Sequence, residues 1–143
     1  MRVFIDTNLW AYRLDRREPE KSAFVKYWLR GIAEEHDIVV STQILIELRS
    51  VLTRKLDPPL SWSDTRAALE ALSEFEVVPA NSSLVLDAHE LANTEQLSWF
   101  NALIAEAAIR SGCSVLYSED LNHGQRYGDL TVHNPLRDME GGV

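Results

Sequence analysis

Four polar residues of this 143-residue chain carry side-chain oxygen atoms and stand next to apolar stretches. They are Asp6, Glu47, Asn101 and Asp120. Three of them are carboxylates, and the fourth is the neutral amide with nearly the shape of aspartate. Oxygen ligands of this kind suit Mg²⁺ or Mn²⁺. If the four residues gathered in one crevice, their charges would repel one another, and a divalent cation would be the natural compensation.

The two aspartates follow predicted strands. Asp6 comes directly after the apolar run 3–5, and Asp120 comes soon after the run 115–117. Asp6 could also cap the helix that follows it, and aspartate is common in a loop after any strand. In parallel α/β sheets the ligand crevice lies outside the carboxyl ends of the strands. Both aspartates are therefore expected at that crevice.

The other two residues are expected on helices, beside apolar faces. Glu47 borders an apolar stripe, where a carboxylate is uncommon unless something compensates its charge. It could instead be a solvated residue at the edge of the stripe, or pair with Arg54 or Arg110. Asn101 lies three residues after Ser98, the expected cap of its helix, and could be a polar residue of the first turn. The positive end of that helix would favour aspartate over asparagine here.

The elements that must position these residues alternate along the chain. Strands are predicted at 2–5, 38–40, 75–78, 114–117 and 130–132. Helices are predicted at about 9–14, from Pro19, from Ser41 or Thr42 to about 55, from Ser63 to about 73, from Ser82 or Ser83 to about 94, and from Ser98 to Gly112. This alternation predicts an α/β fold, a three-layer α/β/α sandwich with a central, mostly parallel sheet and right-handed crossovers.

The composition is that of one folded domain, expected to span residues 1–143. Hydrophobic residues make up 45% of the chain and charged residues 25%, which is ordinary for a soluble globular protein. No apolar run approaches the roughly 20 residues that cross a bilayer, and the N-terminus lacks the apolar stretch of a secretory signal. We therefore expect a cytoplasmic protein with no membrane contact.

Cysteine content and charge exclude other classes. Cys113 is the only cysteine, which rules out an intrachain disulfide and a cysteine-based zinc site. The net charge of −8 argues against a simple nucleic-acid-binding module, because such modules hold phosphates with a basic face. It does not argue against a nuclease, whose bound metal reverses the local field. A haloacid-dehalogenase-like phosphatase needs a second aspartate two residues after the first, where this chain has Asn8.

Four short runs follow one another in an order and spacing that resemble a known family. They are FIDTN at 4–8, IEL at 46–48, SWFNALIA at 98–105 and LYSEDL at 116–121. Each run alone is a weak signal, but the ordered set resembles the four motif regions of the PIN domain, and more narrowly the VapC toxins of VapBC toxin–antitoxin pairs. The resemblance covers nearly the whole chain. It implies a PIN-like fold and a metal-dependent endoribonuclease.

The resemblance also implies a role for each site residue. In that family the positions matching Asp6, Glu47 and Asp120 bind the divalent metal, and a hydroxyl such as that of Thr7 supports the first aspartate. The position matching Asn101 is normally aspartate, so this chain departs from the pattern there. Glu47 is expected to bind metal or to position water. The expected metal ligands are Asp6, Asp120 and Asn101. The expected supporting residues are Thr7, Asn8 and Ser118.

The implied reaction is hydrolysis of an RNA phosphodiester bond. Mg²⁺ or Mn²⁺ would polarise a phosphodiester oxygen and activate a water for in-line attack on phosphorus. Loss of one charge-assisted contact at Asn101 should cost about 1.5–3 kcal/mol, or roughly 10- to 150-fold in metal affinity or rate. The alternative is a non-catalytic PIN-like module, for binding or regulation, whose nuclease site has decayed. Asn101 supports that alternative, and the three retained carboxylates argue against it.

The resemblance implies partners as well. In the family, a small VapB-type antitoxin wraps the toxin with its C-terminal segment and often places a basic side chain at the acidic site. VapC toxins also usually form homodimers. The RNA substrate could be positioned by basic residues at the rim of the crevice, although such residues are more commonly a solvated surface. The candidates are Arg13, Arg16, Arg17, Arg49 and Arg126.

Overall fold

The computed structural model describes residues 1–141 and contains a six-stranded sheet. The strands lie in the order β3-β2-β1-β4-β6-β5. Their bounds are β1 Arg2–Ile5, β2 Asp37–Ser41, β3 Glu76–Val78, β4 Val115–Tyr117, β5 Arg126–Tyr127 and β6 Leu130–His133. Neighbouring strands pair in parallel, except β5, which is antiparallel to β6. The prediction of a central, mostly parallel sheet is confirmed.

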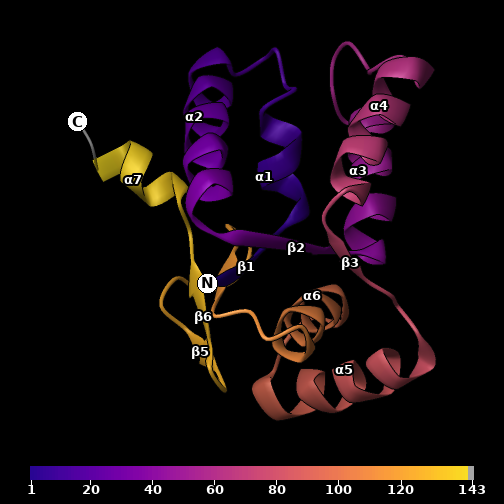
Figure 1. The fold of residues 1–143 in the computed structure, drawn as a ribbon, viewed down its shortest axis with the longest axis vertical. Helices are drawn as coiled ribbons and strands as arrows, with labels where there is room; N and C mark the ends of the chain where they lie inside the picture. The colour runs from indigo at the N-terminus through magenta and orange to yellow at the C-terminus, as the bar shows by residue number, and fades with distance from the viewer. Residues whose placement is uncertain (142–143) are drawn as a thin grey trace.

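Helices cover both faces of the sheet (Figure 1). They are α1 Thr7–Tyr12, α2 Pro19–Glu35, α3 Thr42–Arg54, α4 Trp62–Ser73, α5 Ser82–Glu95, α6 Trp99–Arg110 and α7 Leu136–Gly141. Figure 1 shows α1 to α4 on one side of the sheet and α5 packed with α6 on the other. This is the predicted three-layer sandwich. Among residues 1–141, no helix is long and apolar enough to cross a membrane.

The first strand lies at the centre of the core. Val3, Phe4 and Ile5 are fully buried, as expected for a parallel strand that is covered on both faces. The chain leaves β1 toward β2 on one side of the sheet and later returns to β4 on the other side of β1. A ligand crevice is expected where the direction of crossover changes in this way. It therefore lies between the carboxyl ends of β1 and β4.

One helix cap differs from the sequence-based prediction. Ser61 caps α4, because its Oγ accepts a hydrogen bond from the backbone N–H of Asp64 at 3.1 Å, so the prediction of Ser63 as the cap is wrong. α5 begins at Ser82, as predicted, and Asn81 caps it. Each stretch offers several residues that can cap a helix. The local sequence does not choose among them, because neighbouring residues of the same capping type are equivalent in the sequence.

Short elements also differ from the prediction, whereas the predicted end of α6 agrees with it. α1 begins at Thr7, about two residues before the predicted start, because Asp6 caps it. The sequence pattern does not predict β5 or α7, which are two and six residues long, too short for a periodic signal. Gly112 has a positive φ of 75° just after α6, as expected for a residue that ends a helix.

Candidate active site

Asp6 lies at the carboxyl end of β1, and only 6% of its surface is exposed. Its Oδ1 accepts a hydrogen bond from the backbone N–H of Thr7 at 2.7 Å, which caps α1. Its Oδ2 accepts a hydrogen bond from the hydroxyl of Ser118 at 2.8 Å. The capping role and the site role offered by the sequence are therefore compatible. One carboxylate begins a helix and also faces a crevice.

Burial raises the pKa of the Asp6 carboxyl from 3.8 to about 6. The hydrogen bonds from Thr7 and Ser118 lower this pKa, whereas the charges of Asp120 and Glu47 raise it. Burial has the largest effect, because the ionised form loses its hydration there. An ionised Asp6 is thus incompletely compensated by the protein alone, and a cation beside it would favour the ionised form.

Ser118 connects the two aspartates of the site. It follows β4, and its side chain is fully buried. Its hydroxyl donates to Asp6 and accepts a hydrogen bond from the backbone N–H of Asp120 at 3.1 Å. In the sheet, Ile5 lies in register with Tyr117, so Asp6 and Ser118 leave neighbouring strands at the same level. The hydroxyl of Ser118, a predicted supporting residue, therefore orients the Asp6 carboxylate and also holds the loop that carries Asp120.

Glu47 extends from α3 toward the same crevice. Its Oε2 accepts a hydrogen bond from the hydroxyl of Thr7 at 3.2 Å, and its Oε1 accepts one from the side-chain amide of Gln43. The alternative pairing with Arg110 does not occur, because that arginine binds Asp87 at 2.8 Å. The sequence analysis missed the role of Gln43. Gln43 lies four residues before Glu47 on a predicted helix, and this spacing could have predicted their side-chain contact.

Asn101 occupies the first turn of α6, as predicted. Ser98 caps this helix, and its hydroxyl accepts the backbone N–H of Asn101 at 3.4 Å. Gln43 joins α6 to α3, because its amide also donates to the backbone carbonyl of Phe100 at 3.3 Å. The helices that carry Glu47 and Asn101 are therefore held beside each other at the crevice.

All four candidate residues line one cavity of about 270 Å³. Phe100 and Ile104 complete its lining. The residues come from β1, α3, α6 and the loop after β4, so they are brought together by the fold and not by sequence proximity. Asn8 does not line this cavity, and its side chain makes no hydrogen bond within residues 1–141. The lining residues from the sequence prediction are Asp6, Glu47, Asn101 and Asp120.

The donor set is suitable for a hard divalent cation. It offers three carboxylates and one amide oxygen, which are ligands that Mg²⁺ and Mn²⁺ accept. Within residues 1–141, no three Asp, Glu, His or Cys side chains lie close enough together to hold a metal ion on their own. The three carboxylates of the cavity are therefore separate candidate ligands. Mg²⁺ is usually bound through one or two carboxylates and keeps several waters, so a site for it does not need all three to converge.

The arginines expected at the RNA do not line the carboxylate cavity. Arg17 is held by Asp15 through two hydrogen bonds of 3.0 and 2.9 Å. Arg49 lines a hollow between α3 and α4, and Arg126 is exposed on the edge strand β5. Arg13 and Arg16 instead line another cavity.

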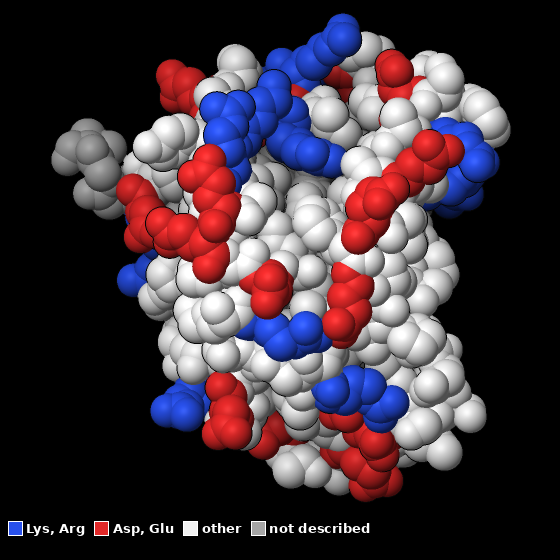
Figure 2. Space-filling view, in the orientation of Figure 1, with Lys and Arg blue, Asp and Glu red and all other residues white. Residues whose placement is uncertain are grey.

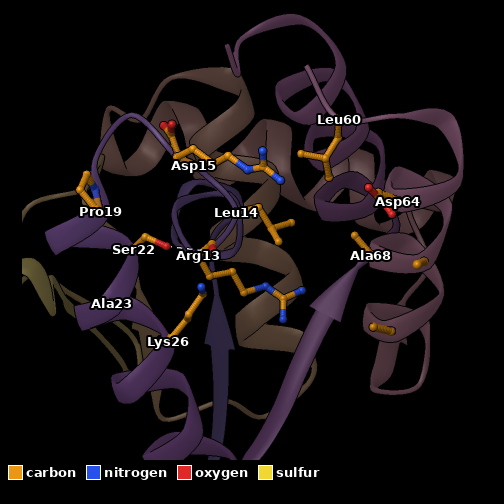
Figure 3. Close-up of a pocket in the computed structure, with 13 residues that line it drawn as sticks. Arg13, Leu14, Asp15, Pro19, Ser22, Ala23, Lys26, Leu60, Asp64 and Ala68 are labelled. Carbon is orange, nitrogen blue, oxygen red and sulfur yellow. Dashed lines mark hydrogen bonds between the residues drawn. The ribbon is translucent and has the colours of Figure 1, made fainter. Parts of the chain in front are cut away.

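This second cavity, of about 790 Å³, lies between α2 and α4 at the end of α1 (Figure 3). In Figure 3, Pro19, Ser22 and Ala23 lie on one side and Leu60, Asp64 and Ala68 on the other. Figure 2 shows basic side chains gathered at the top of this face, with acidic ones below and to both sides. The cavity combines an apolar wall with basic groups and with two acidic ones, Asp15 and Asp64. The basic side chains that line it are Arg13, Arg16 and Lys26.

Arg13 is a half-buried cation at this cavity. Its Nε is buried and has no hydrogen-bond partner within residues 1–141. Burial lowers the pKa of its guanidinium. Its guanidinium carbon lies 5.5 Å from the centre of the Trp10 ring, a cation–π distance. A buried polar group without a partner is costly, so this side chain is poised to accept an anionic group.

Comparisons with known proteins agree with the fold. Residues 3–128 match the model of a protein family described as the PIN domain. A search of curated proteins gave no match.

Solved structures of similar fold include VapBC2 from Rickettsia felis, bound to a DNA fragment from its promoter, with a TM-score of 0.65 and 20% identity over 94% of this chain and 98% of that chain. VapBC-1 from nontypeable Haemophilus influenzae has a TM-score of 0.65 and 20% identity over 95% and 99% of the two chains. VapC20 from Mycobacterium tuberculosis, described as a toxin that cleaves the sarcin–ricin loop, has a TM-score of 0.61 and 17% identity over 81% and 88%. At these identities, the likeness shows a shared fold.

Proposed function

Because this chain belongs to the PIN-domain family, we propose that it is the toxin of a VapBC-type toxin–antitoxin module and a divalent-metal-dependent endoribonuclease, weakened by Asn101. The observation that carries the proposal is the convergence of Asp6, Glu47, Asn101 and Asp120 on one cavity at the carboxyl ends of β1 and β4. The same cavity would be difficult to explain as ordinary surface, because one of its carboxylates is buried.

The residues would divide the work as follows. Asp6, Asp120 and Asn101 hold the cation through side-chain oxygens, and Glu47 binds it or orients the attacking water. The cation supplies charge compensation and Lewis acidity at the phosphodiester. Thr7 fixes Glu47 through its hydroxyl and Asp6 through its backbone N–H. Ser118, which follows the neighbouring strand β4, holds Asp6 through its hydroxyl. These contacts leave the carboxylates of Asp6 and Glu47 little freedom to reorient.

Asn101 makes the site less negative than aspartate would, but it still provides an oxygen ligand. Its amide oxygen can still bind a cation, but the charge-assisted part of the contact is lost. We expect a site with lower affinity for Mg²⁺ or Mn²⁺ than one with aspartate at this position. The difference should be roughly 10- to 150-fold in affinity or rate, the equivalent of about 1.5–3 kcal/mol.

The proposal is tested by comparing this chain with Asn101→Asp. RNA cleavage is measured with Mg²⁺ or Mn²⁺, on single-stranded RNA and on a structured RNA such as tRNA, with EDTA as the metal-free control. We expect cation-dependent cleavage that is stronger for Asn101→Asp. Asp6→Ala in the Asn101→Asp background should abolish it, which excludes a contaminating nuclease. If neither the natural chain nor Asn101→Asp cuts any RNA, the nuclease proposal fails.

Asn101 favours one alternative, a non-catalytic PIN-like module with a decayed site. Calorimetric titration with Mn²⁺ separates the two proposals. A functional site should bind Mn²⁺ in Asn101→Asp more tightly than in the natural chain. A decayed site should bind none in either protein.

We also propose a VapB-type antitoxin as the partner, with a segment seated in the larger cavity. Three observations support this. The cavity has an apolar wall formed by residues such as Leu14, Leu60 and Ala68. Its basic residues make no ion pair within residues 1–141. The Nε of Arg13 has no hydrogen-bond partner within residues 1–141. An amphipathic segment could pack its apolar face on this wall and pair an acidic side chain with the basic residues.

Homodimerisation is proposed as well. Ile46 and Phe100 are 66% and 65% exposed on α3 and α6 beside the carboxylate cavity, where solvent-exposed apolar side chains favour contact with a second chain. Light scattering of the isolated chain should then give about twice the 16.2 kDa of one chain. A particle that stays monomeric at high concentration would argue against a dimer.

A further inference from the structure

We propose that Tyr12 is a positioning residue for Asp120, because it anchors the neighbouring Glu119 and so holds the loop after β4 against α1. The inference rests on the proposed function, in which Asp120 is a cation ligand. It concerns a residue outside the cavity lining, and none of the four motif positions includes it. The argument starts from the side-chain contacts of this loop.

Tyr12 is the last residue of α1, and its hydroxyl donates a hydrogen bond to Oε1 of Glu119. The side chain is half-buried. The ammonium group of Lys21 lies 4.4 Å from the centre of its ring, which adds a cation–π contact from α2. Tyr12 is therefore fixed between α2 and the loop. Because Lys21 contacts its ring, Tyr12 can restrain the Glu119 side chain that it binds.

Asp120 has little restraint of its own. Its side chain is exposed and makes no hydrogen bond within residues 1–141. Only its backbone N–H is bound, to the hydroxyl of Ser118. The direction of the Asp120 carboxylate thus depends on the backbone of the loop. Its neighbour Glu119 is the residue that ties this backbone to a helix.

α1 consequently connects both aspartates. Its N-terminus is capped by Asp6, and its last residue holds Glu119, next to Asp120. The helix has six residues, a length of roughly 9 Å, and is too short to bend appreciably. A displacement of the loop relative to α1 would change the distance between the two aspartates. The contact at Tyr12 opposes that displacement.

The contact also keeps the charge of Glu119 away from the cavity. Glu119 does not line it, whereas Asp120 does. Burial, the bond to Glu119 and the negative charges of Glu18 and Asp120 raise the pKa of Tyr12. The phenol therefore stays protonated and acts as a donor at neutral pH. Without this donor, the Glu119 carboxylate would be free to turn toward the other acids and disturb the ligand geometry.

The test uses Asn101→Asp as the background and Mn²⁺ as the probe. Tyr12→Phe removes only the hydroxyl. We expect the Kd for Mn²⁺, measured by calorimetry, to rise about tenfold, the lower end of the effect of residues that orient metal ligands. RNA cleavage should need a correspondingly higher Mn²⁺ concentration, with little change in the RNA KM. Tyr27→Phe is the matched control, because Tyr27 is 78% exposed on α2, and it should leave the Mn²⁺ Kd unchanged.

Variants of Glu119 separate positioning from general destabilisation. Glu119→Ala should raise the Kd as much as Tyr12→Phe does, and the double variant should be no worse than either single one, because both break the same contact. Glu119→Gln keeps an acceptor oxygen and should recover most of the affinity. Circular dichroism verifies that each variant is folded.

Two failures can be told apart. If Asn101→Asp binds Mn²⁺ but Tyr12→Phe binds it equally well, or if the two losses add, the positioning role is wrong and the proposed function stands. If Asn101→Asp binds no Mn²⁺, there is no cation site to position, and both proposals are overturned.

Discussion

At the scale of single residues, the carboxylate of Asp6 has both a folding role and a chemical role. It caps α1 through the N–H of Thr7 and accepts the hydroxyl of Ser118, yet its burial still raises its pKa to about 6. Two good hydrogen bonds therefore do not offset the loss of hydration and the nearby charges of Asp120 and Glu47. The fold retains an acid that costs stability when ionised, which is typical of functional sites.

The pH dependence of stability should report this cost. The folded pKa of Asp6 lies above its ordinary value of 3.8, so the folded state holds the proton to higher pH than the unfolded state does. Stability should therefore fall as pH rises between about 4 and 6, by up to about 3 kcal/mol from this residue. Asp6→Asn removes the titration and keeps a capping side chain. In EDTA at pH 7.5, the Asp6→Asn variant should have a higher free energy of unfolding than the unsubstituted chain. At pH 4, the difference between the two free energies should be smaller.

Urea unfolding at the two pH values measures both free energies. Asp129→Asn changes an exposed aspartate that does not line the carboxylate cavity, and it should show no such narrowing gap. An equal difference between Asp6→Asn and the natural chain at pH 4 and pH 7.5 would contradict the assigned cost of burial.

At the scale of elements, the ends of helices place the site residues. α1 starts at Asp6, and the first turn of α6 carries Asn101 after its Ser98 cap. α4 shows how a cap is selected, since Ser61 and Ser63 are chemically identical and only the first accepts a backbone N–H of the helix.

Removal of the correct cap should cost stability, and removal of the other serine should not. We expect Ser61→Ala to lower the free energy of unfolding by about 1 kcal/mol, because the N–H of Asp64 loses its acceptor. Ser63→Ala should change it by less than about 0.5 kcal/mol, as exposed positions usually do. Chemical denaturation of the two variants side by side gives the comparison. A larger loss for Ser63→Ala would mean that the helix begins later than the structure indicates.

At the scale of the whole molecule, the fold separates two surfaces of different chemistry. The carboxylate cavity lies at the carboxyl ends of the central strands, whereas the larger cavity with Arg13, Arg16 and Lys26 lies beyond the other end of α1 (Figure 3). The net charge of −8 conceals this division. In the function proposed above, the carboxylate cavity would hold a cation beside RNA, and the larger cavity would hold an acidic, amphipathic segment of the antitoxin.

This division predicts the effect of a charge reversal on partner binding. The probe is the protein encoded by the gene immediately upstream, co-expressed with this chain. Arg13→Glu should weaken the complex by at least about tenfold, because it places a like charge against the acidic segment. Lys55→Glu is the control, since Lys55 is exposed and does not line the larger cavity. Affinities measured by surface plasmon resonance that respond equally to both variants would contradict docking at Arg13.

The sequence by itself determined the class of fold and the identity of the candidate ligands. Val3 to Ile5 are apolar without interruption, which specifies a central parallel strand and puts Asp6 at its carboxyl end. Ser98 precedes an apolar helix and caps it as expected. Such signals are local, because burial pattern and capping depend on residues within one or two turns. The ordered motifs also match the PIN domain over residues 3–128.

Only the tertiary structure decided which side chains meet. Gln43 and Thr7 hold Glu47, whereas the arginine pairs suggested by the sequence do not form with it. Tyr12 meets Glu119 across more than a hundred residues of chain. Such contacts depend on how helices pack around the sheet and on which groups are left buried together. No local sequence pattern predicts these contacts, because the two residues of each contact become neighbours only in the folded chain.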